Sequence, residues 1–157
     1  MKNQHMMTVV FAALFAILSQ AAAGENEVSK NKVPKAVLEA FEKSYPNAKD
    51  VEFEKEMFEG KAAYEVEYKD NGKEYEAMYN VDGVLVQREE EIDVSALPEA
   101  VTNAIKKEHP KAKIEEAEKL MKPDGTLSGY EVDIKTGEDK FELEVDTAGK
   151  ILKTEKD

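Results

Sequence analysis

The chain has 157 residues, a formal net charge of −12 and no cysteine. The lack of cysteine excludes disulfides, lipid attachment to a cysteine and thiol chemistry, so core packing alone must stabilise the fold. The negative charge argues against nucleic acids and anionic membrane surfaces as partners, because both repel a chain of this sign.

The first 23 residues predict a cleaved signal peptide (residues 1–23). Lys2 precedes an apolar stretch over residues 9–18, which is shorter than the ~20 residues that a membrane-spanning helix needs. Alanines at positions 21 and 23 match the small-residue cleavage pattern, so we expect the exported chain to begin near Gly24, with residues 24–32 as an N-terminal extension. A retained membrane anchor is the alternative interpretation.

Export determines the location and the charge that we expect for the processed chain. Lys2 is the only charged residue that cleavage removes, so 21 basic and 34 acidic side chains remain, a net charge of −13. We expect a periplasmic or secreted protein with no membrane contact after cleavage.

Two stretches of the remaining chain resemble each other. Residues 33–41 correspond to residues 97–105 at an offset of 64, and residues 64–68 correspond to residues 130–134 at an offset of 66. This pattern predicts two tandem repeats of a compact unit, residues 33–92 and residues 97–157, joined by a short connection.

Each predicted repeat begins with a helix. Pro34 and Pro98 stand where the first position of a helix tolerates proline, and apolar residues follow at helical spacing. Pro46 and Pro110 exclude the preceding residue from the helical region, so we expect both helices to end there. Val37, Phe41, Val101 and Ile105 are the residues that we expect these helices to bury.

Strands are predicted after each helix, because apolar and acidic residues then alternate. The segments 70–73 and 80–83 contain Asn-Gly and Asp-Gly, the strongest short-range hairpin signals. The predicted fold class is α+β, with two tandem repeats that each comprise one helix followed by about four antiparallel strands, and with the helices packed on one face of the sheets.

The inventory of reactive side chains predicts no enzyme and no cofactor. After export only His109 remains as a histidine, at a predicted helix end where Tyr45 stands in the other repeat, so a structural role is expected. Three turns rich in oxygen ligands, at residues 70–72, 80–83 and 123–125, lack the spacing of a calcium-binding EF-hand loop, so no metal site is predicted.

Acidic residues occupy the strand positions opposite the apolar ones. Like charges that face each other across strands destabilise a sheet by up to ~1 kcal/mol per pair. The arrangement suits either a solvated surface that resists aggregation or a docking face for a cationic partner. The candidate partner-binding residues are Glu65, Glu67, Glu74, Glu76, Glu131, Asp133, Glu142 and Glu144.

The ordered motifs, each present twice, resemble those of the PepSY-like family, which includes beta-lactamase-inhibitor-like domains. They are Val33-Pro34 and Leu97-Pro98, Tyr45-Pro46-Asn47-Ala48 and His109-Pro110-Lys111-Ala112, Tyr64-Glu65-Val66 and Tyr130-Glu131-Val132, and Asn80-Val81-Asp82-Gly83 and Asp146-Thr147-Ala148-Gly149.

The resemblance implies an exported α+β protein whose tandem sheets lie side by side, and whose relatives bind or inhibit extracytoplasmic enzymes. The function expected is that of a non-enzymatic binding protein that modulates such an enzyme. The alternative is a carrier of calcium or another small ligand on the acidic face. The hairpin tips are further candidate contacts: Asp70, Asn71, Gly72, Lys73, Gly137, Glu138 and Asp139.

Overall fold

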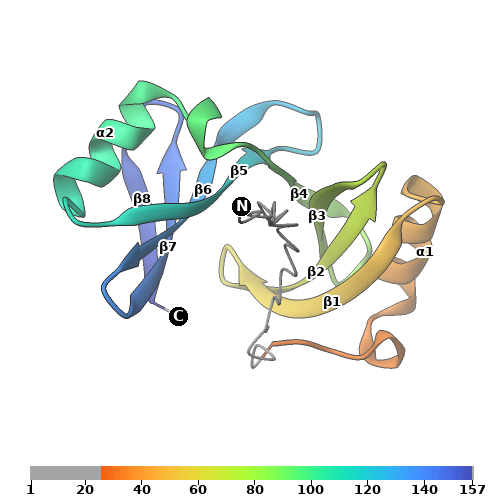
Figure 1. The fold of residues 1–157 in the computed structure, drawn as a ribbon. Coiled ribbons are helices and arrows are strands. Elements are labelled where there is room, and N and C mark those ends of the chain that lie inside the picture. The colour runs from red at the N-terminus through yellow and green to blue at the C-terminus, as the bar shows by residue number, and fades with distance from the viewer. Residues whose placement is uncertain (1–25, 157) are drawn as a thin grey trace, which may run out of the picture.

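The computed structural model describes residues 26–156 (Figure 1). The predicted signal peptide and its cleavage point lie outside the described residues. The helices and strands are α1 (Lys35–Ser44), β1 (Lys49–Phe58), β2 (Lys61–Asp70), β3 (Lys73–Asn80), β4 (Leu85–Glu91), α2 (Glu99–Glu108), β5 (Lys113–Met121), β6 (Leu127–Thr136), β7 (Asp139–Asp146) and β8 (Ile151–Lys156), with single 3-10 turns at Lys30–Lys32 and Val94–Ala96. Within this range, no helix has the length and apolar character that a membrane span requires.

All eight strands form one antiparallel sheet in chain order, β1 to β8, which curls into a half-barrel (Figure 1). The α+β class is therefore confirmed. The resemblance implied two sheets side by side, but β4 pairs with β5 from Arg88 opposite Met121 to Glu91 opposite Glu118. This pairing covers two strand edges that would otherwise present unpaired backbone groups.

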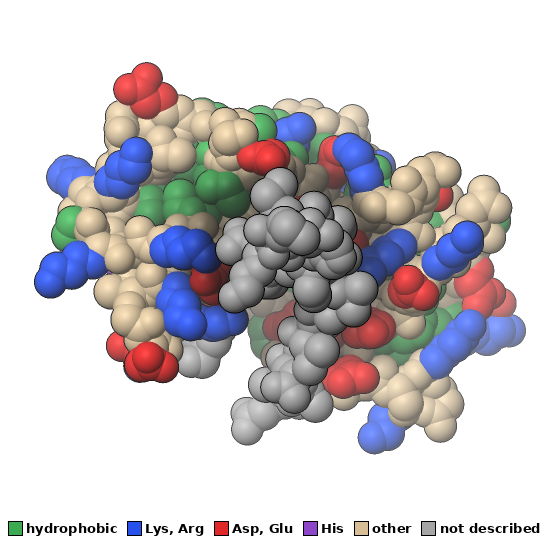
Figure 2. Space-filling view, in the orientation of Figure 1, with side chains coloured by type: hydrophobic (Ala, Val, Ile, Leu, Met, Phe, Trp, Pro, Cys, Tyr) green, Lys and Arg blue, Asp and Glu red, His purple; other side chains and the backbone are tan. Residues whose placement is uncertain are grey.

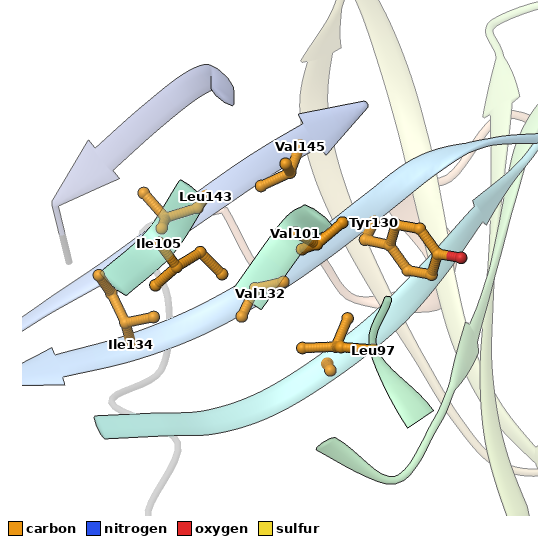
Figure 3. Packing of buried hydrophobic residues seen from close by; sticks show 9 residues of the cluster. Leu97, Val101, Ile105, Tyr130, Val132, Ile134, Leu143 and Val145 are labelled. Carbon is orange, nitrogen blue, oxygen red and sulfur yellow. The ribbon is translucent and has the colours of Figure 1, made fainter. Parts of the chain in front are cut away.

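Both helices pack on the outer face of the sheet. Val37 and Phe41 of α1 lie in a core that includes Val66, Tyr68 and Tyr79. Figure 3 shows the second core, in which α2 packs against β6 and β7. The buried residues of that core are Leu97, Val101, Ile105, Ala117, Tyr130, Val132, Ile134, Leu143 and Val145.

The helix ends follow the prolines with one small difference from the prediction. Pro34 and Pro98 are the residues before the first turn rather than the first helical residues, with φ of −55° and −59°. Proline fits this place equally well, because its ring fixes φ near −65° and no backbone donor is needed there. The helices end as expected, at Tyr45 and His109, whose backbone N–H groups donate to the carbonyls of Phe41 (2.8 Å) and Ile105 (2.7 Å).

The turns between strands depend on residues that tolerate positive φ. Asn71 and Gly72 join β2 to β3 with φ of 52° and 81°, the signs that a tight hairpin turn requires at both positions. Gly83 and Gly149 lie in the β3–β4 and β7–β8 turns, where an added Cβ would collide with the carbonyls of Ala36 and Ala100. These two close contacts fix α1 and α2 against the sheet.

Truncation of Phe41 tests the packing of α1. Phe41 is only 3% exposed, so Phe41→Ala is expected to lower the free energy of unfolding by about 3–5 kcal/mol through lost burial and the cavity that remains. Lys43→Ala, on the exposed side of the same helix, is the control and is expected to change it by less than ~0.5 kcal/mol. Urea unfolding followed by circular dichroism measures both; a loss below ~1 kcal/mol for Phe41→Ala would show that α1 is packed differently.

Candidate binding site on the concave face

The sheet face opposite the two helices is lined with carboxylates, and we call it the acidic concave face. On this face, many pairs of directly opposed residues on neighbouring strands are both acidic. The register between the strands aligns their acidic positions. The acidic pairs, from β1 to β8, are Glu52 and Glu67, Glu54 and Glu65, Glu67 and Glu76, Glu76 and Glu89, Glu91 and Glu118, Glu116 and Asp133, Glu118 and Glu131, Glu131 and Glu144, Asp133 and Glu142, and Glu142 and Glu155.

The curl of the sheet turns this face inward. A hollow of about 1040 Å³ is lined both by Glu54 and Met57 of β1 and by Glu144 and Lys153 of the last two strands. Two further hollows, of about 680 Å³ and about 130 Å³, share Glu76, Glu116 and Glu118. Figure 2 shows several recessed acidic side chains on this side of the molecule. Carboxylates that alternation alone would place in open solvent are therefore crowded along a groove.

All eight acidic residues predicted from the alternation line these hollows, although to different degrees. Glu74 is exposed, whereas the other seven are partly buried. The hollows bring together Glu65, Glu131, Glu142 and Glu144 in the largest one, Glu67, Glu74 and Glu76 in the second, and Glu76, Glu131, Asp133 and Glu142 in the smallest.

Sequence reasoning missed the carboxylates of the two central strands. Glu89 and Glu118 are 3% and 8% exposed and are the buried charged residues of the described chain. Glu118 gave only a weak signal: Glu116 and Glu118 flank the apolar Ala117, but Glu115 and Lys119 interrupt the alternation. Glu89 gave no such signal, because it stands in the run Arg88-Glu89-Glu90-Glu91, where charges occupy both faces.

Burial raises the pKa of the carboxyls on this face, and neighbouring carboxylates raise it further. The pKa of Glu65 is raised to about 8, that of Glu118 to about 9 and that of Glu131 to about 10, in each case first by burial and then by the charge of Glu89. Burial raises the pKa of Glu142 to about 7, and burial together with Glu65 raises that of Glu76. Each of these carboxylates thus lacks solvation that would stabilise its ionised form, and within the described chain Glu142 alone among them has a lysine, Lys153, as an ion-pair partner.

Few cationic side chains of the described residues reach this face. Lys153 of β8 lies 3.0 Å from Glu155 and 3.9 Å from Glu142, and Lys69 lies 2.8 Å from Glu74. Both pairs are at the margins of the face. The centre, where β3, β4 and β5 meet, contains no ion pair among those found in the described part of the chain.

The hairpin tips lie outside the three acidic hollows. Lys73 pairs with Glu90 at 3.3 Å and Asp139 with Lys156 at 2.7 Å, so each tip is tied to an adjacent strand. Two of the three turns rich in oxygen ligands, those at residues 80–83 and 123–125, are likewise explained by local hydrogen bonds. The side chain of Asn80 accepts from the backbone of its own turn, and that of Asp124 accepts from the backbone N–H of Thr126 at 2.9 Å.

The side chain of His109 packs against an aromatic ring and does not line the three acidic hollows. Its ring lies 5.8 Å from that of Phe141, at the end of α2. Tyr45 holds the corresponding place at the end of α1, where its ring lies 4.6 Å from Tyr68.

One further hollow, of about 670 Å³, lies between the N-terminal segment, α1 and β1. Its walls include the apolar side chains of Val28, Leu38 and Phe53. It does not open on the carboxylates of the central strands.

Comparison with known proteins places this geometry in a family. Residues 21–87 and residues 62–153 each match the family described as "Putative beta-lactamase-inhibitor-like, PepSY-like". The chain belongs to the PepSY-like family. A comparison with curated proteins found no match.

Solved structures share the PepSY-like fold at low sequence identity. A BLIP-like protein from Bacteroides fragilis is 22% identical, with 78% of this chain and 86% of that chain covered and a TM-score of 0.53. A structure from Bacteroides eggerthii described among "putative periplasmic proteins" is 17% identical, with coverage of 79% and 88% and a TM-score of 0.61. A DUF2874 family protein from Bacteroides uniformis is 19% identical, with coverage of 78% and 88% and a TM-score of 0.59.

The raised pKa values predict how stability depends on pH. A carboxyl whose pKa is higher in the folded than in the unfolded chain makes the folded protein bind more protons, so its contribution to stability is complete below pH ~4.5 and is lost as the pH rises through the folded pKa. The melting temperature of chelator-treated protein is therefore expected to fall between about pH 5 and about pH 9, as Glu142, Glu65 and Glu118 ionise.

Two double variants of this PepSY-like protein separate that effect from net charge. Glu65→Gln with Glu131→Gln removes two partly buried carboxyls and should flatten the pH profile, whereas Glu39→Gln with Glu42→Gln removes two exposed carboxyls of α1 and should not. Differential scanning calorimetry measures both. A melting temperature that rises over this pH range in the unmodified protein would contradict the assignment of these carboxyls as buried.

Proposed function

We propose that the chain is a non-enzymatic periplasmic binding protein whose acidic concave face receives a positively charged segment of a protein partner. The observation that carries the proposal is the line of paired carboxylates across all eight strands, with few cationic side chains to balance them. The family description, beta-lactamase-inhibitor-like, supports a protein partner, and an extracytoplasmic enzyme that the protein modulates or inhibits is the partner that we propose.

A cationic segment relieves an unfavourable state of the free protein. Glu65 and Glu131 lie in a hollow where burial opposes their ionisation. A lysine or arginine side chain reaching into that hollow supplies the missing counter-charge, and the low local dielectric strengthens the attraction. The field of the whole face also attracts such a partner from a distance, so association should be fast and sensitive to salt.

We also propose that the two halves, residues 33–92 and 97–157, are copies of one unit, which gives the partner two equivalent sets of carboxylates. Equivalent contacts support this: the side chain of Asn80 accepts from two backbone N–H groups of the β3–β4 turn, and that of Asp146 does the same in the β7–β8 turn. Glu65 and Glu67 of the first half then correspond to Glu131 and Asp133 of the second.

The hairpin tips are not part of the proposed surface. Lys73 and Asp139 are engaged in ion pairs, and the tips lie outside the acidic hollows. A partner that fills the groove can still contact them at its margin.

Export to the periplasm is tested by the mass of the mature chain. The neighbour from Bacteroides eggerthii, described among "putative periplasmic proteins", supports export, and the alanines at positions 21 and 23 support cleavage before Gly24. Intact-mass spectrometry of the protein from an osmotic-shock fraction is expected to give the mass of residues 24–157. A mass that still includes residues 1–23 would contradict export by a cleaved signal peptide.

Binding is tested with two variants that each replace four acidic side chains by neutral amides. The groove variant carries Glu65→Gln, Glu67→Gln, Glu131→Gln and Asp133→Asn, and the control variant carries Glu39→Gln, Glu42→Gln, Glu99→Gln and Glu108→Gln on the exposed sides of the helices. The probe is a synthetic peptide rich in lysine and arginine, followed by stopped-flow fluorescence at low and high salt.

The association rate of this peptide is expected to fall at least ~10-fold for the groove variant and much less for the control variant. Added salt should slow binding to the unmodified protein and have less effect on the groove variant. Equal rates for the two variants would show that net charge, and not the acidic concave face, attracts the peptide.

A further inference from the structure

The centre of the acidic concave face contains a compact group of three carboxylates from adjacent strands. They are Glu76 of β3, Glu89 of β4 and Glu118 of β5, and one oxygen atom from each lies within 4.8 Å of the other two. Glu76 is the direct cross-strand neighbour of Glu89, whereas Glu118 lies diagonally, opposite Glu91. The group therefore depends on the pairing of β4 with β5.

Glu89 supplies a second observation that points to a ligand at this group. The residue is 3% exposed, and its Oε1 atom accepts a hydrogen bond of 3.0 Å from the side-chain amide of Gln87. Its Oε2 atom is buried and has no hydrogen-bond partner. A buried carboxylate oxygen with no partner is costly and rare in folded proteins, so we expect a cation or a proton to compensate it.

We propose that Glu76, Glu89 and Glu118 bind one divalent cation of the size of Ca²⁺ at the floor of the acidic concave face. This inference goes beyond the proposed binding of a protein segment, because the cation can bind to this group when no protein partner is present.

The separation of the oxygen atoms fits such an ion. An ion with bonds of about 2.3–2.6 Å to oxygen spans ligands up to about 5 Å apart, and three carboxylates can supply up to six oxygen atoms. Mg²⁺ requires shorter bonds of about 2.0–2.1 Å and a regular octahedron, which suits this group less well. Zinc prefers nitrogen and sulfur ligands, and the group contains neither histidine nor cysteine.

The surroundings of the group suit an ion that comes from solvent. The hollow of about 130 Å³ is lined by Glu76 and Glu118 and gives space for water molecules that complete the coordination. Glu65 and Glu131 flank the three ligands along the same face.

A proton is the alternative occupant, because a neutral carboxyl of Glu118 can donate to Glu89. The experiment therefore compares metal ions with acid. Thermal unfolding of the purified protein is measured at neutral pH after chelator treatment, with CaCl₂, MgCl₂ or KCl at matched ionic strength. CaCl₂ is expected to raise the melting temperature by several degrees, MgCl₂ less, and KCl hardly at all.

Glu89→Gln is the decisive variant. The amide keeps the shape of the side chain and is neutral, so the variant should fold at least as well as the unmodified protein, while its calcium affinity, measured by isothermal titration calorimetry, should fall at least ~10-fold. Glu52→Gln, an exposed carboxyl on the same face, removes the same charge and should keep the affinity within about twofold.

Three outcomes would overturn the proposal. They are a melting temperature that responds to CaCl₂ no more than to KCl, a calcium response that is the same in Glu89→Gln and in the unmodified protein, and a melting temperature that rises on acidification but not on addition of CaCl₂ at neutral pH. The first two would leave the binding of a cationic peptide to the wider face unaffected, since that binding is measured separately and without metal.

Discussion

The pairing of β4 with β5 is the contact on which the acidic concave face depends. Four residue pairs join the two halves, and the backbone N–H of Ile92 extends the ladder with a bond of 2.9 Å to the carbonyl of Ala117. Without this pairing the chain would form two four-stranded sheets, each with one short row of carboxylates. With it, one curled sheet brings Glu89 and Glu118 together and makes the rows continuous.

The two faces of the sheet contribute to stability with opposite signs. On the outer face, two apolar cores bury Phe41 and Ile105 against the strands, and this burial is the main source of stability. On the inner face, carboxylates oppose each other at nearly every step, which destabilises the sheet. A protein that keeps such an arrangement in its interior groove gives up stability there, and sites of this kind are expected where function, and not folding, determines the side chains.

The sequence allowed prediction of what depends on neighbouring residues. The helix ends at Tyr45 and His109 follow from the prolines after them, and the hairpin between β2 and β3 follows from Asn71-Gly72. The alternation of Tyr64, Glu65 and Val66 placed the carboxylates on one face. The curl and the β4–β5 pairing could not be predicted in this way, because both result from contacts between residues far apart in the chain.

The unpredicted residues illustrate the same limit. Glu89 and Glu90 are adjacent and chemically identical, yet Glu90 is on the outer face, 3.3 Å from Lys73, and Glu89 is buried in the groove. Only the register with β3 decides which of them belongs to the site.

The site has a thermodynamic consequence: a cation held by Glu76, Glu89 and Glu118 neutralises part of the charge that attracts a basic segment. Linkage requires that the segment weaken the binding of the cation by the same factor. A periplasmic protein with both ligands would release its partner as the concentration of the cation rises.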